Sequence, residues 1–247
     1  MKKSPALAAL VCAVALAPLT ACGPDTGRTA ADGSKPPRST SDTRPNGISS
    51  RSAREIYEAG TKANAASGSF RMQSKSTETE SDIRVSATEC VGKVHLLKDG
   101  DGVINGAFEL IQKDNDVWAK LDKRLSEMFN QEGEKIPADE WLHGTPNTPL
   151  LKITLSHCQR NKLTAPDQGD SYMKKGSVAS IDGVPVIQVT SSGSGGTATY
   201  SIATTGKPNL IKRAVDQDKQ TTITYSKFGE PVGAKKPTGT ITEAPSH

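Results

Sequence analysis

Large aromatic side chains and long apolar runs are both scarce in this 247-residue sequence. Only 4% of the residues are Phe, Trp or Tyr, and 34% are hydrophobic. The longest apolar run extends from Ala6 to Leu19, interrupted only by Pro18. It covers roughly 14 residues, whereas a helix that crosses a bilayer needs about 20. This run is therefore too short to span a membrane, and any folded core must be sparingly packed.

Signals for nucleic-acid binding, metal binding and catalysis are also missing. Basic residues are scattered singly without interleaved aromatic residues, and Lys2 and Lys3 account for half of the formal net charge of +4. The four histidines show no metal-ligand spacing. Ser171 and Lys174 have a Ser-x-x-Lys spacing, but the Lys-Thr-Gly motif that accompanies it in enzymes is absent. We therefore expect no nucleic-acid partner, no metal, no cofactor and no enzymatic activity.

The first 21 residues are typical of an export signal. Two lysines precede the apolar run, and the small residues Thr20 and Ala21 separate it from Cys22. The segment Leu19–Cys22 resembles the lipobox of bacterial lipoproteins. The resemblance implies that residues 1–21 are removed and that Cys22 receives two acyl chains, which hold a protein stably at a membrane. We expect anchoring at the extracytoplasmic face of the cell membrane; the alternative is a secreted soluble protein with a chance cysteine.

The remainder of the chain divides by composition. Residues 22–50 contain almost no large apolar side chain except Ile48, so we expect a lipidated, disordered tether. Residues 51–240 are long enough for one domain with its own core. Residues 241–247 are expected to form a frayed tail.

Local patterns in residues 51–240 predict an α+β fold rich in antiparallel strands. Ser52 and Glu55 have the spacing of a capping box, which predicts a helix that ends near Gly68. After that helix the apolar period becomes two, as in half-buried strands. Asp182-Gly183 between two β-prone runs predicts a hairpin turn. Residues 122–165 interrupt the strands, and we expect one or two short helices there.

Two cysteines remain in the domain once Cys12 is removed and Cys22 is lipidated. Cys90 and Cys158 would lie in a compartment that permits disulfides, so an even pair is most simply a disulfide bond. The alternative is a metal or redox role. His157 adjoins Cys158, but neither further histidine ligands nor a Cys-x-x-Cys spacing accompanies the pair.

Taken together, the order of segments resembles the LolA-like lipoproteins of actinobacteria, of the LppX/LprG type. The resemblance implies a single curved antiparallel sheet, a LolA-like half-barrel, wrapped over a few helices with an apolar cavity between them for acyl chains. It brings no catalytic residues. The segments that carry it are Leu19–Cys22, Ser69–Met72, Cys90–Val94, Phe108–Ile111, Val117–Lys120, Asp182–Val186, Thr205–Pro208 and Tyr225–Val232.

Five aromatic residues are candidates for the main apolar volume, because of their period and their positions on the expected sheet and insertion. They either pack a solid core or line a ligand cavity. The leading hypothesis is a monomeric, membrane-tethered, non-enzymatic domain that binds a hydrophobic ligand such as lipid acyl chains. The alternative is a protein-interaction or sensor module with a filled cavity. The candidates are Phe70, Phe108, Trp118, Phe129 and Trp141.

Overall fold

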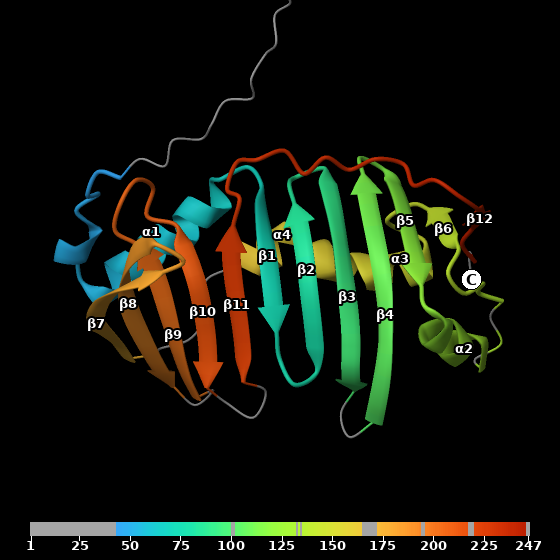
Figure 1. Ribbon diagram of the computed structural model, residues 1–247, viewed down its shortest axis with the longest axis horizontal. Helices are drawn as coiled ribbons and strands as arrows, with labels where there is room; N and C mark the ends of the chain where they lie inside the picture. The colour runs from blue at the N-terminus through green and yellow to red at the C-terminus, as the bar shows by residue number, and fades with distance from the viewer. Residues whose placement is uncertain are drawn as a thin grey trace, which may run out of the picture. The chain divides into compact units, whose positions relative to one another are not determined.

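A single twelve-stranded sheet forms the frame of the domain in the computed structural model (Figure 1). The strand order is β12-β6-β5-β4-β3-β2-β1-β11-β10-β9-β8-β7. Neighbouring strands are antiparallel, except that β12 is parallel to β6. The structure describes residues 43–245, apart from residues 100–101, 132, 134, 165–171, 194–195 and 217–219.

The strands form two antiparallel meanders, β1 to β6 and β7 to β11, which meet where β1 pairs with β11; α2 lies between β5 and β6, and α3, η2 and α4 lie between β6 and β7. The strands are β1 (Phe70–Lys75), β2 (Thr79–Val85), β3 (Glu89–Asp99), β4 (Gly102–Lys113), β5 (Asp116–Leu121), β6 (Trp141–Gly144), β7 (Tyr172–Ile181), β8 (Val184–Gly193), β9 (Gly196–Ala203), β10 (Leu210–Asp216), β11 (Thr221–Ser226) and β12 (Ile241–Glu243). The helices are η1 (Ile48–Ser50), α1 (Ala53–Ala65), α2 (Lys123–Gln131), α3 (Pro149–Leu155), η2 (Ser156–Cys158) and α4 (Arg160–Thr164). The predicted α+β class is confirmed, and residues 122–165 contain three short α-helices and one 3-10 turn where one or two short helices were expected.

Helix α1 begins where its capping residues place it. The Ser52 side chain accepts a hydrogen bond from the Glu55 amide, and the Glu55 carboxylate accepts one from the Ser52 amide. These two bonds satisfy amides that a helix start otherwise leaves unpaired. The predicted capping box is confirmed, and the helix ends at Ala65, three residues before Gly68.

The Asp182-Gly183 turn joins β7 and β8 as predicted. Both residues have positive φ angles, 49° and 81°. A two-residue hairpin turn of this kind requires φ above zero at both central positions, which Asp tolerates and Gly adopts freely. The turn fixes the register in which Ile181 pairs with Val184.

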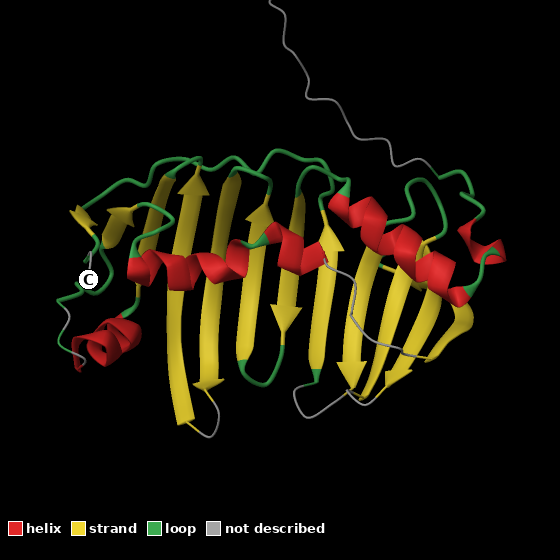
Figure 2. Ribbon diagram, turned by 180° about the vertical axis from the view of Figure 1, so that it is seen from behind, coloured by secondary structure: helices red, strands yellow, loops and turns green. Residues whose placement is uncertain are grey.

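Helices α1, α3 and α4 lie on the same face of the sheet (Figure 2). We call this the inner face and the opposite one the outer face. Helix α1 packs against β7 to β10, and α3 packs against β4 and β5. Between helices and sheet lies a core made mostly of aliphatic side chains, including the fully buried Ile56, Ile83, Leu110, Leu151 and Ile202.

The folded part begins before residue 51, inside the segment expected to be a disordered tether. Pro45 forms a β-bridge with Thr205, and the Asn46 side chain donates hydrogen bonds to the carbonyls of Ala203 and Gly206. Ile48 is only 2% exposed. The burial of Ile48, the side-chain bonds of Asn46 and backbone bonds such as that from the Asn46 amide to the Thr204 carbonyl thus dock residues 43–50, which corrects the predicted boundary. Residues 22–42 lie outside the described part.

The end of the chain is also more ordered than expected. Residues 241–243, placed in a frayed tail, form β12 and pair with Trp141, Leu142 and His143 of β6. The prediction considered only the local composition, whereas the strand is stabilised by a partner about 100 residues away in sequence. The predicted tail is therefore wrong for these three residues.

Candidate functional site

Phe70 and Phe108 lie on the inner face, in the core beneath the helices. Phe70 is 2% exposed and meets the Tyr225 ring edge-on at a centroid distance of 5.9 Å. Phe108 is 5% exposed and meets the His157 ring at 5.5 Å. Burial lowers the pKa of His157, which favours the neutral ring against this apolar partner. Both phenylalanines thus occupy packed positions.

Phe129 belongs to α2 and packs, partly buried, at the edge of the same core. Helix α2 reaches the sheet through Leu125, whose side chain lies over Gly106 of β4. A Cβ atom at position 106 would come within 2.7 Å of Leu125. Gly106 therefore permits a close approach that any larger residue would block.

Trp118 and Trp141 are on the outer face, which separates them from the three phenylalanines. On β5 the neighbours of Trp118, Val117 and Ala119, are both 0% exposed and belong to the inner core. Because successive strand residues point to opposite faces, Trp118 points outward. It stacks on His143 at 5.4 Å, and Lys120 lies 5.0 Å from the centre of the Trp141 ring. The five aromatic residues thus surround no common volume.

The two remaining cysteines form a disulfide between the sheet and the helical layer. Cys90 on β3 and Cys158 in η2 have Cα atoms 6.1 Å apart. Cys90 is 0% exposed and lies on the inner face. The bond therefore fixes the α3–η2 segment to the centre of the sheet, beside Phe108 and His157.

A strip of half-buried apolar side chains continues the inner face beyond the core. Leu96 lies near the end of β3, Ile104 near the start of β4 and Ile223 near the start of β11, so the antiparallel order brings all three to one end of the sheet. Helices α3 and α4 cross the central strands above these ends (Figure 2). We call this set the inner strip; its members are Leu96, Ile104, Met173, Ala198 and Ile223.

The outer face carries a hollow whose lining residues are mostly polar or charged. A shallow hollow of about 710 Å³ is lined by side chains that include Gln73, Lys75, Glu80, Lys93 and Thr224. Hydroxyl, amide and charged groups of both signs surround it. An acyl chain in this hollow would desolvate charged groups without replacing their hydrogen bonds, which opposes its binding there.

A cross-strand row of charges explains this polarity. Asp82, Lys93, Glu109 and Lys120 are consecutive partners across β2, β3, β4 and β5, so the sign alternates from strand to strand. Lys120 lies 3.4 Å from Glu109. Opposite charges at directly paired positions stabilise a sheet, and these side chains remain in contact with water.

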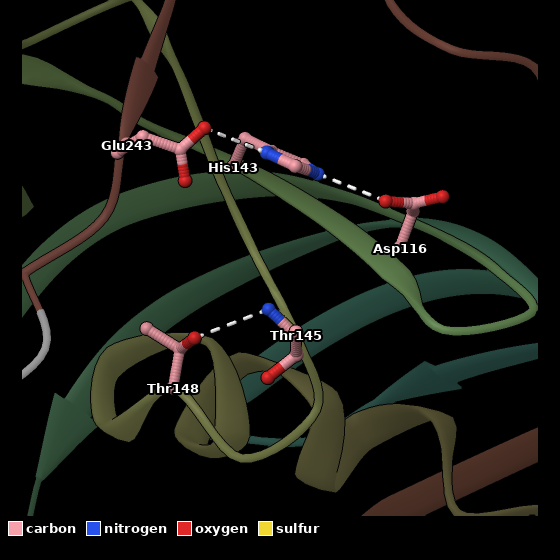
Figure 3. A network of polar contacts seen from close by, with 5 residues as sticks. All are labelled: Asp116, His143, Thr145, Thr148 and Glu243. Atoms are coloured by element: carbon pink, nitrogen blue, oxygen red, sulfur yellow. Dashed lines mark hydrogen bonds and ion pairs between the residues drawn. The ribbon is translucent and has the colours of Figure 1, made fainter.

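A second polar cluster lies on the outer face at the β6 end of the sheet. The His143 ring lies between two carboxylates, with Nδ1 2.9 Å from Glu243 Oε1 and Nε2 3.0 Å from Asp116 Oδ1 (Figure 3). Hydrogen bonds to Glu243 and then Asp116 raise the pKa of His143, against a smaller opposing effect of burial. Below it in the figure, Thr148 Oγ1 accepts a hydrogen bond from the Thr145 amide at the turn into α3.

Other sequence candidates yield no chemical centre in the part that the structure describes. No group of three His, Cys, Asp or Glu residues among the described residues is arranged to hold a metal ion. Ser171 of the Ser-x-x-Lys pattern, the export signal and Cys22 lie outside the described residues. Within residues 43–245, as far as they are described, no helix is long and apolar enough to cross a membrane.

Comparisons with known proteins identify the fold. No protein-family model matches the sequence, and no curated protein sequence matches it. The crystal structure of LprF from Mycobacterium bovis is similar, with a TM-score of 0.51 and 17% identity over 76% of this chain and 97% of LprF. The lipoprotein LppX from Mycobacterium tuberculosis gives 0.48 and 16%, over 74% of this chain and 98% of LppX. The predicted LolA-like half-barrel is thereby confirmed as the fold.

Proposed function

We propose that this chain, which shares the LprF fold, is a lipid-anchored extracytoplasmic protein that binds an apolar ligand without catalysing a reaction. Its anchor is Cys22, and its ligand is an acyl chain or a group of similar chemistry. The ligand contacts the inner strip, and the buried Phe70 and Phe108 belong to the packed core of the same face. Trp118 and Trp141, on the outer face, take no part.

The observation that carries this proposal is the contrast between the inner strip and its surroundings. Its members lie on five different strands at one end of the sheet, all facing the same side. Strands β2 and β1, which separate Leu96 from Ile223, carry Ser81 and Ser74 on this face, so the strip consists of separate apolar groups on one face. Each group offers half-buried contacts to a hydrophobic ligand, and an acyl chain gains about 0.8 kcal/mol for each methylene that it buries.

The test is native mass spectrometry and lipid extraction on the full chain, purified without denaturants. We expect near-stoichiometric lipid on the unaltered chain and acyl chains on Cys22 in the N-terminal peptide. The double variant Leu96→Gln with Ile104→Gln should lose at least half of the bound lipid, because half-buried amides replace apolar contacts.

Two control variants separate the inner strip from the outer face. Ile111→Gln makes the same type of change on the outer face of β4, and Trp118→Ala removes one of the two indole rings on that face. Both should retain the ligand. An unaltered chain that neither carries lipid nor takes it up on incubation would contradict the proposal. It would favour the alternative in which the domain contacts another envelope protein.

A further inference from the structure

The last part of the chain returns across the sheet before it ends. After β11 it runs along one end of the strands to reach β12 at the far edge (Figure 1). Arg84 Nη2 donates a hydrogen bond to the Pro231 carbonyl, at 2.6 Å, and holds the start of this path. At its end, the Trp141 amide donates to the Thr240 carbonyl and the Ala244 amide to the His143 carbonyl. A ladder of three residue pairs is short, so side-chain contacts matter to its stability.

The side-chain contact to β12 is made by His143, and its geometry requires a proton. Both ring nitrogens are within 3.0 Å of carboxylate oxygens, which only accept hydrogen bonds. A neutral imidazole has a single N–H and can donate to one of them. Simultaneous bonds to Glu243 and Asp116 therefore need the imidazolium, with a proton on each nitrogen.

Among the described residues, no hydrogen bond or ion pair joins the ring to a positively charged side chain. One side of the ring stacks on Trp118 of β5. Lys113 on β4 is the cross-strand partner of Asp116, and the Lys120 ammonium on β5 lies 3.4 Å from Glu109. Asp116 and Glu243 thus determine the local field at His143. Their side chains are 60% and 80% exposed, so each can turn toward water once its bond is lost.

We propose that His143 is a proton-operated latch that holds the C-terminal strand β12 against the sheet. The imidazolium ties Glu243 of β12 to Asp116 at the start of β5. When the imidazolium loses one proton to solvent, one of the two carboxylates no longer has a hydrogen-bond donor. That carboxylate then lies opposite a nitrogen lone pair. Strand β12 then detaches more often and uncovers the hydrogen-bonding edge of β6.

The direction in which pH changes the stability of the β12 contact follows from the raised pKa of His143. The pKa of His143 is raised in the folded protein. The stability that the charged ring contributes is therefore fully present below the ordinary histidine pKa of about 6.5, and it is lost as pH rises through the higher folded pKa. The two carboxylates must stay ionised. The latch is therefore closed in mildly acidic solution and weakened in mildly alkaline solution.

Amide hydrogen exchange on the full chain, read by NMR at about pH 6 and about pH 8.5, tests the latch. After correction for intrinsic exchange, the Trp141 and Ala244 amides should lose about two- to fivefold in protection at the higher pH, as expected for exposed ion pairs. His143→Gln should abolish this dependence, since its amide does not titrate. His95→Gln is the matched control, because His95 lies on the same face and bonds the neutral Asn105.

A second measurement keeps the proposal testable if His143→Gln releases β12 altogether. Side-chain ¹⁵N spectra of the unaltered chain should show both His143 nitrogens protonated at pH 6. A neutral ring at that pH would overturn the latch. So would equal protection at the two pH values, or a dependence that His143→Gln retains.

Discussion

The same strands form the inner and outer faces of the sheet, but different interactions stabilise the two faces. On the inner face, aliphatic side chains pack under helices and a disulfide fixes the layers together. On the outer face, charges alternate from strand to strand and Trp118 stacks on a histidine. Period-two alternation separates these two environments within single strands. An aromatic residue in this fold therefore cannot be assigned to a cavity by its hydrophobicity alone.

The largest expected effect comes from breaking the link between the inner face and its helices. Replacing Cys90 and Cys158 together by Ala should reduce the free energy of unfolding by about 4 kcal/mol, because the disulfide closes a long loop and restricts the unfolded chain. Urea denaturation of the full chain measures this difference. A loss under 1 kcal/mol would mean that packing alone holds the helical layer in place.

The second prediction compares two consecutive residues of β4. Leu110 is 0% exposed on the inner face, whereas Ile111 is half-buried on the outer face. Leu110→Ala should cost about 3 kcal/mol, since the cavity adds to the lost burial, and Ile111→Ala about 1 kcal/mol. Denaturant midpoints of the two variants provide the comparison. Equal costs would show that the outer face is as closely packed as the inner one.

The smallest effect is expected from the charges on the outer face. Arg71 donates two hydrogen bonds to the Asp82 carboxylate and lowers the pKa of Asp82. Because both side chains are about one-third exposed or more, Arg71→Ala should cost at most about 1 kcal/mol at neutral pH. This stability is present above the unfolded pKa of about 3.9 and is lost as pH falls through the lowered value.

A double-mutant cycle with Asp82→Asn at pH 7 and pH 2.5 isolates that pair. We expect a coupling energy at pH 7 that shrinks at pH 2.5, where protonation of the carboxylate begins to weaken the pair. A coupling that grows on acidification would contradict the assigned role of Asp82. Added salt should reduce the coupling at pH 7 as well, since solvent ions screen partly exposed charges.

Features with a local cause were predictable from the sequence. The Ser52–Glu55 capping box and the Asp182-Gly183 turn each depend on residues a few positions apart, and both are present. The face on which Trp118 lies had no local signal, because Val117, Trp118 and Ala119 are all apolar and all buried. A run of this kind shows no polar–apolar alternation that would assign its residues to opposite faces.

Features with a distant cause were not predictable. Strand β6 has four residues, too few to show a period, and its parallel partner β12 lies about 100 residues further along the chain. Nothing near Ile241 in sequence indicates that pairing. Similarly, residues 43–50 look like a tether by composition, and they join the domain through partners about 160 residues away in sequence, such as the Ala203 and Gly206 carbonyls.

The Cys90–Cys158 bond also has a mechanical consequence. It closes a covalent ring that holds β3 to β6, α2 and α3, whereas α1, β1, β2 and β7 to β12 lie outside it. A force applied between the two ends of the chain passes through the bond and bypasses the ring. Its 68-residue span, about 230 Å when extended, stays unextended until the bond is reduced. Single-molecule stretching with and without reductant should therefore differ by this contour length.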